Sequence, residues 1–335
     1  MKTSFLLKIC QIACIISFFF LLTHSSLVLD YAKSGLSSWA FSVLPVLLPF
    51  IILSKLWIYY DVPQLFYRAA CRALPGHSHA AVCLTVLLLG LSSGFPVGAI
   101  FVRYFYEKGI LSKRAADGLL PLCSFVSPMF LIGYVRPLTG YTDADWYLFV
   151  LSLYLPLLLC FGSLLVSRAG HHTSKYYPGE RAPHANQHHP AQQASRPVPD
   201  KNVKTASPST LRDVWLSSLE IIFTIGIYMM LFSILFGITL HEPMLRHTVT
   251  EITLSNLEIT TGIGWLSRMS ALSGIVRGAV MAAVVSLGGL CTMAQVHSAT
   301  ISCPFSMSRY LLIKVKCALL SAGLFLLTEH MLSFF

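Results

Sequence analysis

The chain has 335 residues, of which 55% are hydrophobic and only 11% charged, and its mean hydropathy is +0.68. Soluble domains carry about 25% charged residues, so the composition excludes an ordinary soluble protein and indicates an all-α, polytopic protein in a lipid bilayer. The net charge is +10, but the basic residues cluster in short segments between apolar runs. This is the positive-inside pattern of membrane topology, and no nucleic-acid partner is expected. The nine cysteines show no metal-ligand spacing, so no metal, cofactor or structural disulfide is predicted.

The first two candidate spans lie near the amino terminus, since a helix needs about 20 apolar residues to cross a bilayer. Residues 5–29 predict an uncleaved membrane anchor, with a cleaved signal peptide as the alternative. The second span covers 40–60 and contains Pro45 and Pro49. Their missing N–H groups are tolerated at membrane depth only where protein or a cavity covers the backbone. Residues 62–75 then predict an amphipathic helix at the membrane interface.

The next apolar segments are each too short to cross the membrane. Residues 79–91 run into a Ser/Gly/Pro sequence at 92–98, and a second short segment covers 99–106. Two half-length segments joined by such a tip predict a re-entrant hairpin, and the basic residues after it are compatible with its return to the cytoplasmic side. Full spans are predicted at 115–135 and 146–166.

A polar segment divides the chain. Residues 168–212 are rich in Pro, His, Gln and Ser, which predicts a disordered linker whose basic bias places it in the cytoplasm. The amino terminus is also predicted to be cytoplasmic, and the linker histidines are expected to solubilise rather than to bind a metal. A span at 214–240 follows, then an irregular stretch at 256–262, a short apolar segment at 274–287 and a last span at 310–331.

The elements follow a similar order on both sides of the linker, in which Ser93-Gly94 corresponds to Gly288-Gly289. We predict inverted repeats, which would bring the two glycine tips face to face at mid-membrane. Arg309 would then begin the last helix outside, against the positive-inside rule. The predicted fold is a polytopic helical bundle with two related halves, each containing a broken or re-entrant helical hairpin. Its parts are an anchor at 1–30, a first half at 31–167, the linker at 168–212 and a second half at 213–335.

A series of short motifs, taken in chain order, resembles a known family. They are Leu44-Pro45 with Leu48-Pro49-Phe50, the segments 93–99, 127–133 and 258–262, and Gly288-Gly289-Leu290 with Gln295. Together they resemble the YlbJ family of sporulation integral membrane proteins, which carry the nucleoside-recognition ("Gate") domain.

The resemblance implies a transporter-like fold related to nucleoside carriers, and a role in moving a small organic solute, dipicolinic acid in sporulation members. The chain departs from the family at Ser124-Phe125-Val126-Ser127-Pro128, where the family pattern is rich in asparagine. The loss of these amide groups leaves the solute open.

The predicted solute site gathers the glycines and polar residues of these motifs. Backbone N–H groups at a half-helix start near Ser92 favour a carboxylate or phosphate; the alternative is a kink used only for close packing. Glu258 would be functional at membrane depth and without meaning in a surface loop, and Gln295 could bind solute or bridge helices. The candidate residues are Ser92, Ser93, Gly94, Phe95, Pro96, Gly98, Ser124, Ser127, Pro128, Glu258, Thr260, Thr261, Gly288, Gly289 and Gln295.

These features predict a transporter or permease component for a small anionic or nucleoside-like solute in the cell membrane, and not an enzyme. One alternative is a non-transporting scaffold of the envelope or of sporulation. Another is an intramembrane serine protease that pairs Ser92 or Ser93, in a G-x-S-x-G sequence, with His297. The sequence leaves open whether a coupling ion takes part, in which direction solute moves, and the oligomeric state.

Overall fold

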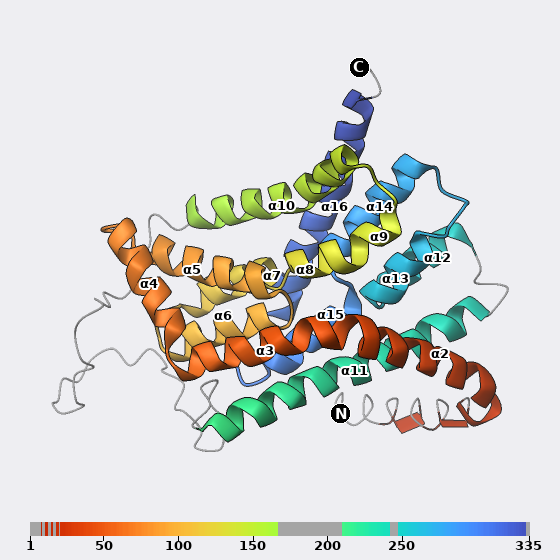
Figure 1. Cartoon of the computed structure of the whole chain (residues 1–335), viewed down its shortest axis with the longest axis horizontal. Coiled ribbons are helices and arrows are strands. Elements are labelled where there is room, and N and C mark those ends of the chain that lie inside the picture. Colours follow the sequence, from red (N-terminus) through yellow and green to blue (C-terminus); the bar gives the residue numbers. More distant parts are fainter. Residues whose placement is uncertain are drawn as a thin grey trace.

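A computed structural model describes residues 21–166, 210–241 and 247–332, together with isolated positions of the first helix (8, 11, 12, 15, 18 and 19). The predicted linker at 168–212 lies outside the described residues, apart from its last three, and so do 14 of the 30 residues of the predicted anchor at 1–30. In the described part the regular elements are all helices (Figure 1). Those long and apolar enough to cross a membrane are Ser25–Tyr59, Lys113–Thr139, Asp143–Val166, Leu211–His241, Gly274–Ala299 and Met307–Met331. The prediction of a polytopic helical membrane protein is confirmed.

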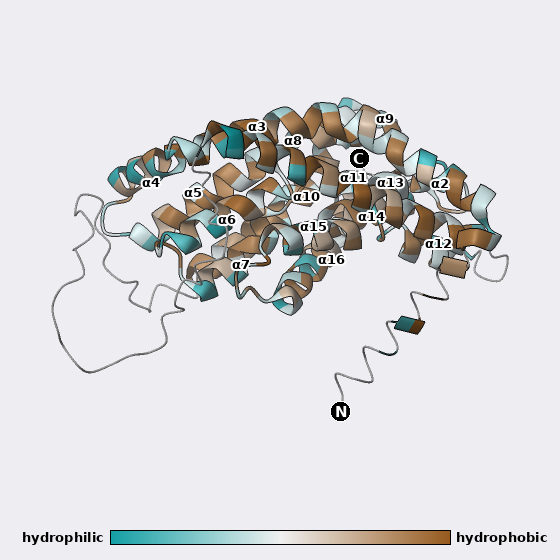
Figure 2. Ribbon diagram, turned by 90° about the horizontal axis from the view of Figure 1, so that it is seen from below, coloured by the Kyte–Doolittle hydropathy of each residue, from teal (hydrophilic) through white to brown (hydrophobic). Residues whose placement is uncertain are grey.

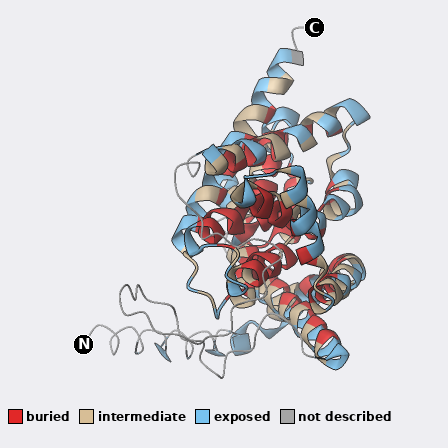
Figure 3. Cartoon of the chain, turned by 90° about the vertical axis from the view of Figure 1, so that its left-hand side faces the viewer, coloured by how far each residue is buried: buried red, intermediate tan, exposed pale blue. Residues whose placement is uncertain are grey.

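The surface of the long helices is apolar. Leu159 and Leu312, for example, are 62% and 71% exposed, and hydrophobic residues make up most of the long helices in Figure 2. Apolar exposure on this scale marks a surface that faces lipid rather than water. The buried residues gather in the middle of the molecule (Figure 3), so the packed core lies between the helices at membrane depth.

The first described span is one long helix with a local distortion. It runs through α2 (Ser25–Ser38), a π-helical stretch η1 (Trp39–Val43) and α3 (Leu44–Tyr59). Pro45 lacks an N–H group, so one helical hydrogen bond is missing at this point, and a π-helical turn accommodates the loss. The predicted start of this span at residue 40 is wrong. Asp30 interrupted the apolar pattern, but it is exposed in the first half of α2 and does not end the helix.

The predicted re-entrant hairpin is present. After the interfacial helix α4 (Val62–Ala73), helices α5 (Ser78–Ser93) and α6 (Val97–Glu107) pack side by side. Gly90 and Gly98 both lie against Cys123, which ends the neighbouring helix α7 (Lys113–Cys123); a Cβ atom at Gly98 would overlap the Cys123 carbonyl group. Glycine thus allows the hairpin to lie directly on α7.

The span that follows the hairpin is broken in the middle. Helix α7 stops at Cys123, and the chain resumes as a helix only at Pro128, whose preceding residue is held extended. In the gap, the Phe125 carbonyl accepts a hydrogen bond of 3.1 Å from the N–H of Phe95 at the hairpin tip. The remaining elements of this half are α8 (Pro128–Phe130), η2 (Leu131–Val135), α9 (Arg136–Thr139) and α10 (Asp143–Val166).

The second half also contains a hairpin, as predicted, but it is shorter and lies at α12–α13 rather than at the Gly288-Gly289 tip. Helices α12 and α13 meet at residues 256–258, and Gly262 lies against the Ser255 carbonyl group. The carbonyl groups of this tip accept the first N–H groups of α15, from Leu290 at 2.8 Å and from Cys291 at 2.9 Å. The elements of this half are α11 (Leu211–His241), α12 (Thr248–Leu254), α13 (Ile259–Leu266), α14 (Gly274–Leu287), α15 (Gly289–Ala299) and α16 (Met307–Leu332).

Side-chain contacts fix the directions of these elements. Asp117 near the start of α7 accepts the N–H of Ser306, just before α16, at 2.9 Å. Arg103 near the end of α6 donates to the carbonyl of Ala299, the last residue of α15, at 3.3 Å. The ends of α6 and α15 and the starts of α7 and α16 therefore lie at one end of the molecule. We call it the basic end, since Lys108, Lys113, Arg114 and Arg309 surround these helix termini.

The two hairpins enter from opposite ends. The start of α5 and the end of α6 both lie at the basic end of the molecule. In the second hairpin, Trp265 in the last turn of α13 packs on Phe236, which is close to the carboxyl end of α11, at the opposite end of the molecule. Figure 1 shows α5 and α6 on the left and α12 and α13 on the right.

The halves are thus inverted, as predicted, but in a different register. The long helix α2–α3 corresponds to α11, hairpin α5–α6 to α12–α13, the broken span α7–α9 to α14–α15, and α10 to α16. The predicted correspondence of Gly94 with Gly288-Gly289 is wrong, because Gly94 reverses a hairpin whereas Gly288 interrupts a spanning helix. In the corrected register Arg309 starts α16 at the basic end, and its conflict with the positive-inside rule disappears.

Candidate functional site

A cavity of about 230 Å³ lies between the two hairpin tips at mid-membrane. Its depth follows from Ser42, near the middle of the helix Ser25–Tyr59, and Met229, near the middle of α11. We call it the central cavity. It brings together six of the residues predicted from the sequence, which are Gly94, Phe95, Ser127, Glu258, Thr260 and Gln295.

Glu258 is buried at the tip of the second hairpin, with 2% of its surface exposed. Its carboxylate caps α13 by accepting N–H bonds from Thr260 at 3.0 Å and Thr261 at 2.7 Å, and a further bond from the Thr260 hydroxyl. The positive end of the helix stabilises a negative charge at this position. Among the described residues no Lys or Arg forms an ion pair with it, so the helix end is its main electrostatic partner.

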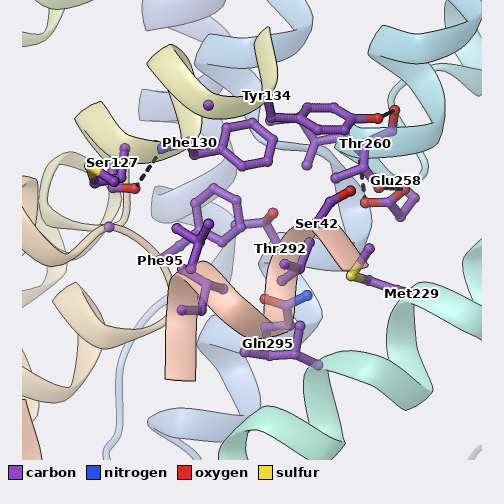
Figure 4. Close-up of a pocket in the computed structure, with 18 of the residues that line it drawn as sticks. Ser42, Phe95, Ser127, Phe130, Tyr134, Met229, Glu258, Thr260, Thr292 and Gln295 are labelled. Carbon is purple, nitrogen blue, oxygen red and sulfur yellow. Dashed lines mark hydrogen bonds between the residues drawn. The ribbon is translucent and has the colours of Figure 1, made fainter. Parts of the chain in front are cut away.

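Three aromatic rings form one wall of the cavity (Figure 4). Phe130 and Tyr134 are stacked with ring centroids 5.2 Å apart, and Phe95 meets Phe130 edge-on at 6.5 Å. Ser127 starts α8 by accepting the N–H of Phe130 at 3.3 Å, and the Tyr134 hydroxyl donates to the Thr260 carbonyl at 2.8 Å. These bonds tie the aromatic wall to both the broken span and the second hairpin.

Two polar side chains from α15 line the opposite side. Thr292 and Gln295 lie one turn apart and are 1% and 5% exposed. The Thr292 hydroxyl and the Gln295 amide oxygen have no hydrogen-bond partner in the described part of the chain, while the Gln295 amide nitrogen donates to the sulfur of Cys291 at 3.2 Å. A buried polar atom left unpaired costs about 1–3 kcal/mol, so the pair indicates that water or a ligand completes the site.

An anion site was predicted at the half-helix start near Ser92, which is the start of α6. There the N–H groups of Gly98 and Ala99 donate to the carbonyls of Gly94 at 2.8 Å and Pro96 at 3.0 Å. The starts of α13 and α15 are satisfied in a similar way. The first N–H groups of α15 are taken by the carbonyls of Asn256 and Leu257, and those of α13 by Glu258. The protein itself therefore satisfies the groups that were expected to bind a carboxylate or phosphate.

The other predicted residues lie outside the wall of the central cavity. Gly289 packs against the Asn256 carbonyl, and Ser124 is buried with no hydroxyl partner among the described residues. Pro128, half-way along the broken span, is exposed. The full set outside the wall is Ser92, Ser93, Pro96, Gly98, Ser124, Pro128, Thr261, Gly288 and Gly289.

The two serines of the G-x-S-x-G sequence have other partners. The Ser92 hydroxyl donates to the Leu89 carbonyl at 2.9 Å, and the Ser93 hydroxyl lies 3.5 Å from that of Ser54. His297 is exposed on α15 and contacts neither in the hydrogen bonds of the described residues. The strand that precedes the nucleophile in this motif also has no counterpart in the described part of the chain.

Several cavity residues were missed by the sequence analysis. Ser42 lies in an apolar run, and only the nearby Pro45 signals that the helix is distorted there. Phe130 and Tyr134 are four residues apart, and Thr292 stands three residues before Gln295, so each shares a helix face with its neighbour. Helical spacing from the predicted residues could have found these three.

Comparison with known proteins gives one partial match. Over 133 residues the chain is 33% identical to the sporulation integral membrane protein YlbJ of Bacillus subtilis (strain 168). This chain is similar to YlbJ. The predicted resemblance is confirmed over that stretch, which covers 36% of this chain and 31% of YlbJ, so the chain spans about a third of the length of YlbJ. No family model and no solved structure matches the chain, and the Gate domain therefore stays a prediction.

Proposed function

We propose that this chain is a membrane transporter, or the permease component of one, whose solute binds in the central cavity. The observation that carries the proposal is the set of buried polar groups at mid-membrane, formed by Glu258, Thr292 and Gln295. Such groups are costly at this depth and usually functional. Inverted halves with broken helices around a midplane site are the architecture of many secondary transporters.

The chemistry of the cavity favours a nucleoside-like solute over an anionic one. The rings of Phe130 and Tyr134 offer a face on which a planar heterocycle can stack. On the other side, the carboxylate and the unpaired oxygens can accept bonds from amino or ring N–H groups. The Glu258 carboxylate would repel a dicarboxylate such as dipicolinic acid. We therefore propose a neutral or cationic planar solute with N–H donors. A role in sporulation rests on the name of the partial relative YlbJ and belongs to this proposal.

A ligand-stabilisation screen on the purified protein tests the proposal. We expect adenosine, uridine or their free bases to raise the melting temperature and dicarboxylates to leave it unchanged. A ligand concentration of 100 times the dissociation constant raises the free energy of unfolding by about 2.7 kcal/mol. The shift should be lost in Gln295→Ala and kept in Leu159→Ala, a lipid-facing control.

Two results would count against the proposal. Stabilisation by dicarboxylates alone would overturn the solute class. If no small molecule stabilised the protein and it co-purified stably with partners, a non-transporting scaffold would be the better conclusion.

A further inference from the structure

A second cavity of about 430 Å³ lies between α3, α6, α11 and α15. Unlike the central cavity it is lined by charged side chains of both signs, those of Lys55, Arg103 and Glu220, together with three serines and one threonine. The solute site proposed above uses none of these three residues.

The second cavity belongs to the basic end of the molecule. Lys55 and Arg103 lie about one helical turn before the ends of α3 and α6. Ser302, which also lines it, lies in the connection to α16. Its polar lining therefore lies close to the helix ends, near the boundary between membrane and water.

Lys55 indicates that this cavity holds water. Lys55 is 9% exposed and has no hydrogen-bond or ion-pair partner in the described part of the chain. The Glu220 carboxylate lines the same cavity, but it forms no direct ion pair with Lys55 among the described residues. An ammonium group buried without a partner is costly, and at membrane depth such groups face a water-filled cavity. Water in the second cavity is the partner that the geometry allows.

Only one layer of residues separates the two cavities. Phe95 lines the central cavity and Pro96, the next residue, lines the second, while Ile225 and Gln295 line both. The hairpin tip, α11 and α15 each contribute to this wall. Elsewhere the rim of the central cavity carries Phe41 and Met129, whose 83% and 48% exposure on a lipid-facing surface offers no aqueous route.

Gln295 is the movable part of the wall. Its amide oxygen has no partner among the described residues, and its amide nitrogen holds only the Cys291 sulfur, a weak acceptor. Rotation of this side chain therefore breaks one weak bond, whereas displacing the hairpin tip would break the bond from Phe95 to Phe125.

We propose that the second cavity is the aqueous vestibule of the central cavity, and that Gln295 and Ile225 form the barrier between them. Solute reaches the central site from the basic end when the Gln295 side chain turns aside. This inference rests on the proposed function for its biological meaning, but the barrier can be measured without any solute.

Thiol accessibility tests the barrier. The nine native cysteines are replaced, and a single cysteine is placed at Ser42 in the central cavity or at Ser298 in the vestibule. A membrane-impermeant cationic methanethiosulfonate is added to the face that carries the basic end. Ser298→Cys should react fast and Ser42→Cys slowly. Because a minor open state is about 0.1–10% populated, Gln295→Ala should speed the reaction of Ser42→Cys by at least about tenfold.

Met229→Ala is the matched control, because Met229 lines only the central cavity. It enlarges that cavity without opening the wall, and the reaction of Ser42→Cys should stay slow. Equal acceleration in Gln295→Ala and Met229→Ala would overturn the barrier, and an unreactive Ser298→Cys would overturn the vestibule. A lack of ligand stabilisation in the screen above, with these rates as expected, would refute the transported solute and leave the barrier standing.

Discussion

The two hairpins share the same arrangement of two helices joined by a tip, but they differ in helix length and in the residues at the tip. In the first, helices of 16 and 11 residues meet at a tip of glycine, phenylalanine and proline. In the second, helices of only 7 and 8 residues meet at a tip that carries the buried Glu258. The first tip donates one backbone hydrogen bond to the break in the adjacent span, whereas the second tip accepts two from the break beside it. The comparison teaches that a long apolar hairpin can shape one side of a site while a short polar hairpin supplies its charge.

The largest expected effect contrasts the close approaches of the two hairpins. Gly98→Ala would drive a methyl group into the carbonyl of Cys123, which ends the buried part of α7, and should lower the free energy of unfolding by more than about 3 kcal/mol. Gly262→Ala meets Ser255 within its own short hairpin, which can shift, and should cost about 1–3 kcal/mol. Thermal unfolding in detergent measures both.

Gly162→Ala is the control for this pair, since a Cβ atom there meets nothing within 4 Å; it should leave stability equal or slightly higher. A larger cost at Gly262 than at Gly98 would show that the second hairpin is the rigid one.

Valine at the two positive-φ glycines should separate folding from binding. Gly94 has φ +72° and Gly289 φ +81°, and a side chain in this region costs about 1–2 kcal/mol, more for a β-branched one. We expect Gly94→Val and Gly289→Val each to lower the free energy of unfolding by about 2–3 kcal/mol. Both variants should still insert into the membrane but should no longer be stabilised by ligand.

The reasons differ between the two sites. At Gly94 the new side chain meets Ser127 beside the central cavity, whereas at Gly289 it meets the Asn256 carbonyl and displaces the second tip. Gly162→Val should retain ligand stabilisation. Full ligand stabilisation in well-folded Gly94→Val would show that the tip serves packing alone.

Substitutions at the helix caps Glu258 and Ser127 should have smaller effects on stability and compare the second hairpin with the broken span beside the first. Glu258→Ala removes the acceptor of one buried and one half-buried N–H group and should cost about 2–3 kcal/mol. Ser127→Ala removes one acceptor at the longer distance of 3.3 Å and should cost about 0.5–1 kcal/mol. Glu258→Gln keeps one acceptor oxygen and should fall between them. Chemical unfolding gives the order, and equal costs for the two alanine variants would mean that the charge adds nothing to the cap.

The smallest effect concerns the outer end of the first hairpin. Partial burial opposes ionisation of Asp61, but hydrogen bonds from Lys108 and Tyr104 outweigh it and hold the pKa of Asp61 below its usual value. A lowered pKa stabilises the fold at pH values above the unfolded pKa of about 3.9, and this stabilisation is lost as the pH falls through the folded value. The pair is half exposed, so Asp61→Asn should cost only about 0.5–1 kcal/mol at pH 7.

The difference in stability between wild type and Asp61→Asn should shrink below about pH 4. A difference that stayed constant between pH 3 and pH 7 would show that ionisation of Asp61 plays no part in holding the hairpin.

Sequence patterns predicted the first hairpin better than the second for a physical reason. The apolar run around residues 79–106 is long enough to stand out from its polar flanks, whereas the second hairpin offers two short helices interrupted by Glu258 and flanked by polar residues. The break at Gly288 was visible as a glycine pair, but a glycine pair does not say whether the chain reverses or continues. That choice is made by contacts distant in sequence, such as Arg103 with Ala299.

The residues of the central cavity were likewise predicted only in part. Gly94, Ser127, Glu258 and Gln295 were found because helix-breaking or polar residues are uncommon in apolar runs. Ser42 and Met229 were not, because nothing in their local sequence sets them apart; the packing of α11 against the distorted first helix brings them to the cavity.

The inverted relation between the two halves also has a consequence for the number of conformations that the protein can adopt. Each half contains the same series of a long helix, a hairpin, a broken span and a final helix, so each can in principle adopt the arrangement now seen in the other. In the transporter proposed above, exchange of the two arrangements would give a second conformer facing the opposite side of the membrane. Since one hairpin is about twice as long as the other, the exchange is not symmetric, and the two conformers must differ in energy. The unequal hairpins would then set which side of the membrane the resting protein faces.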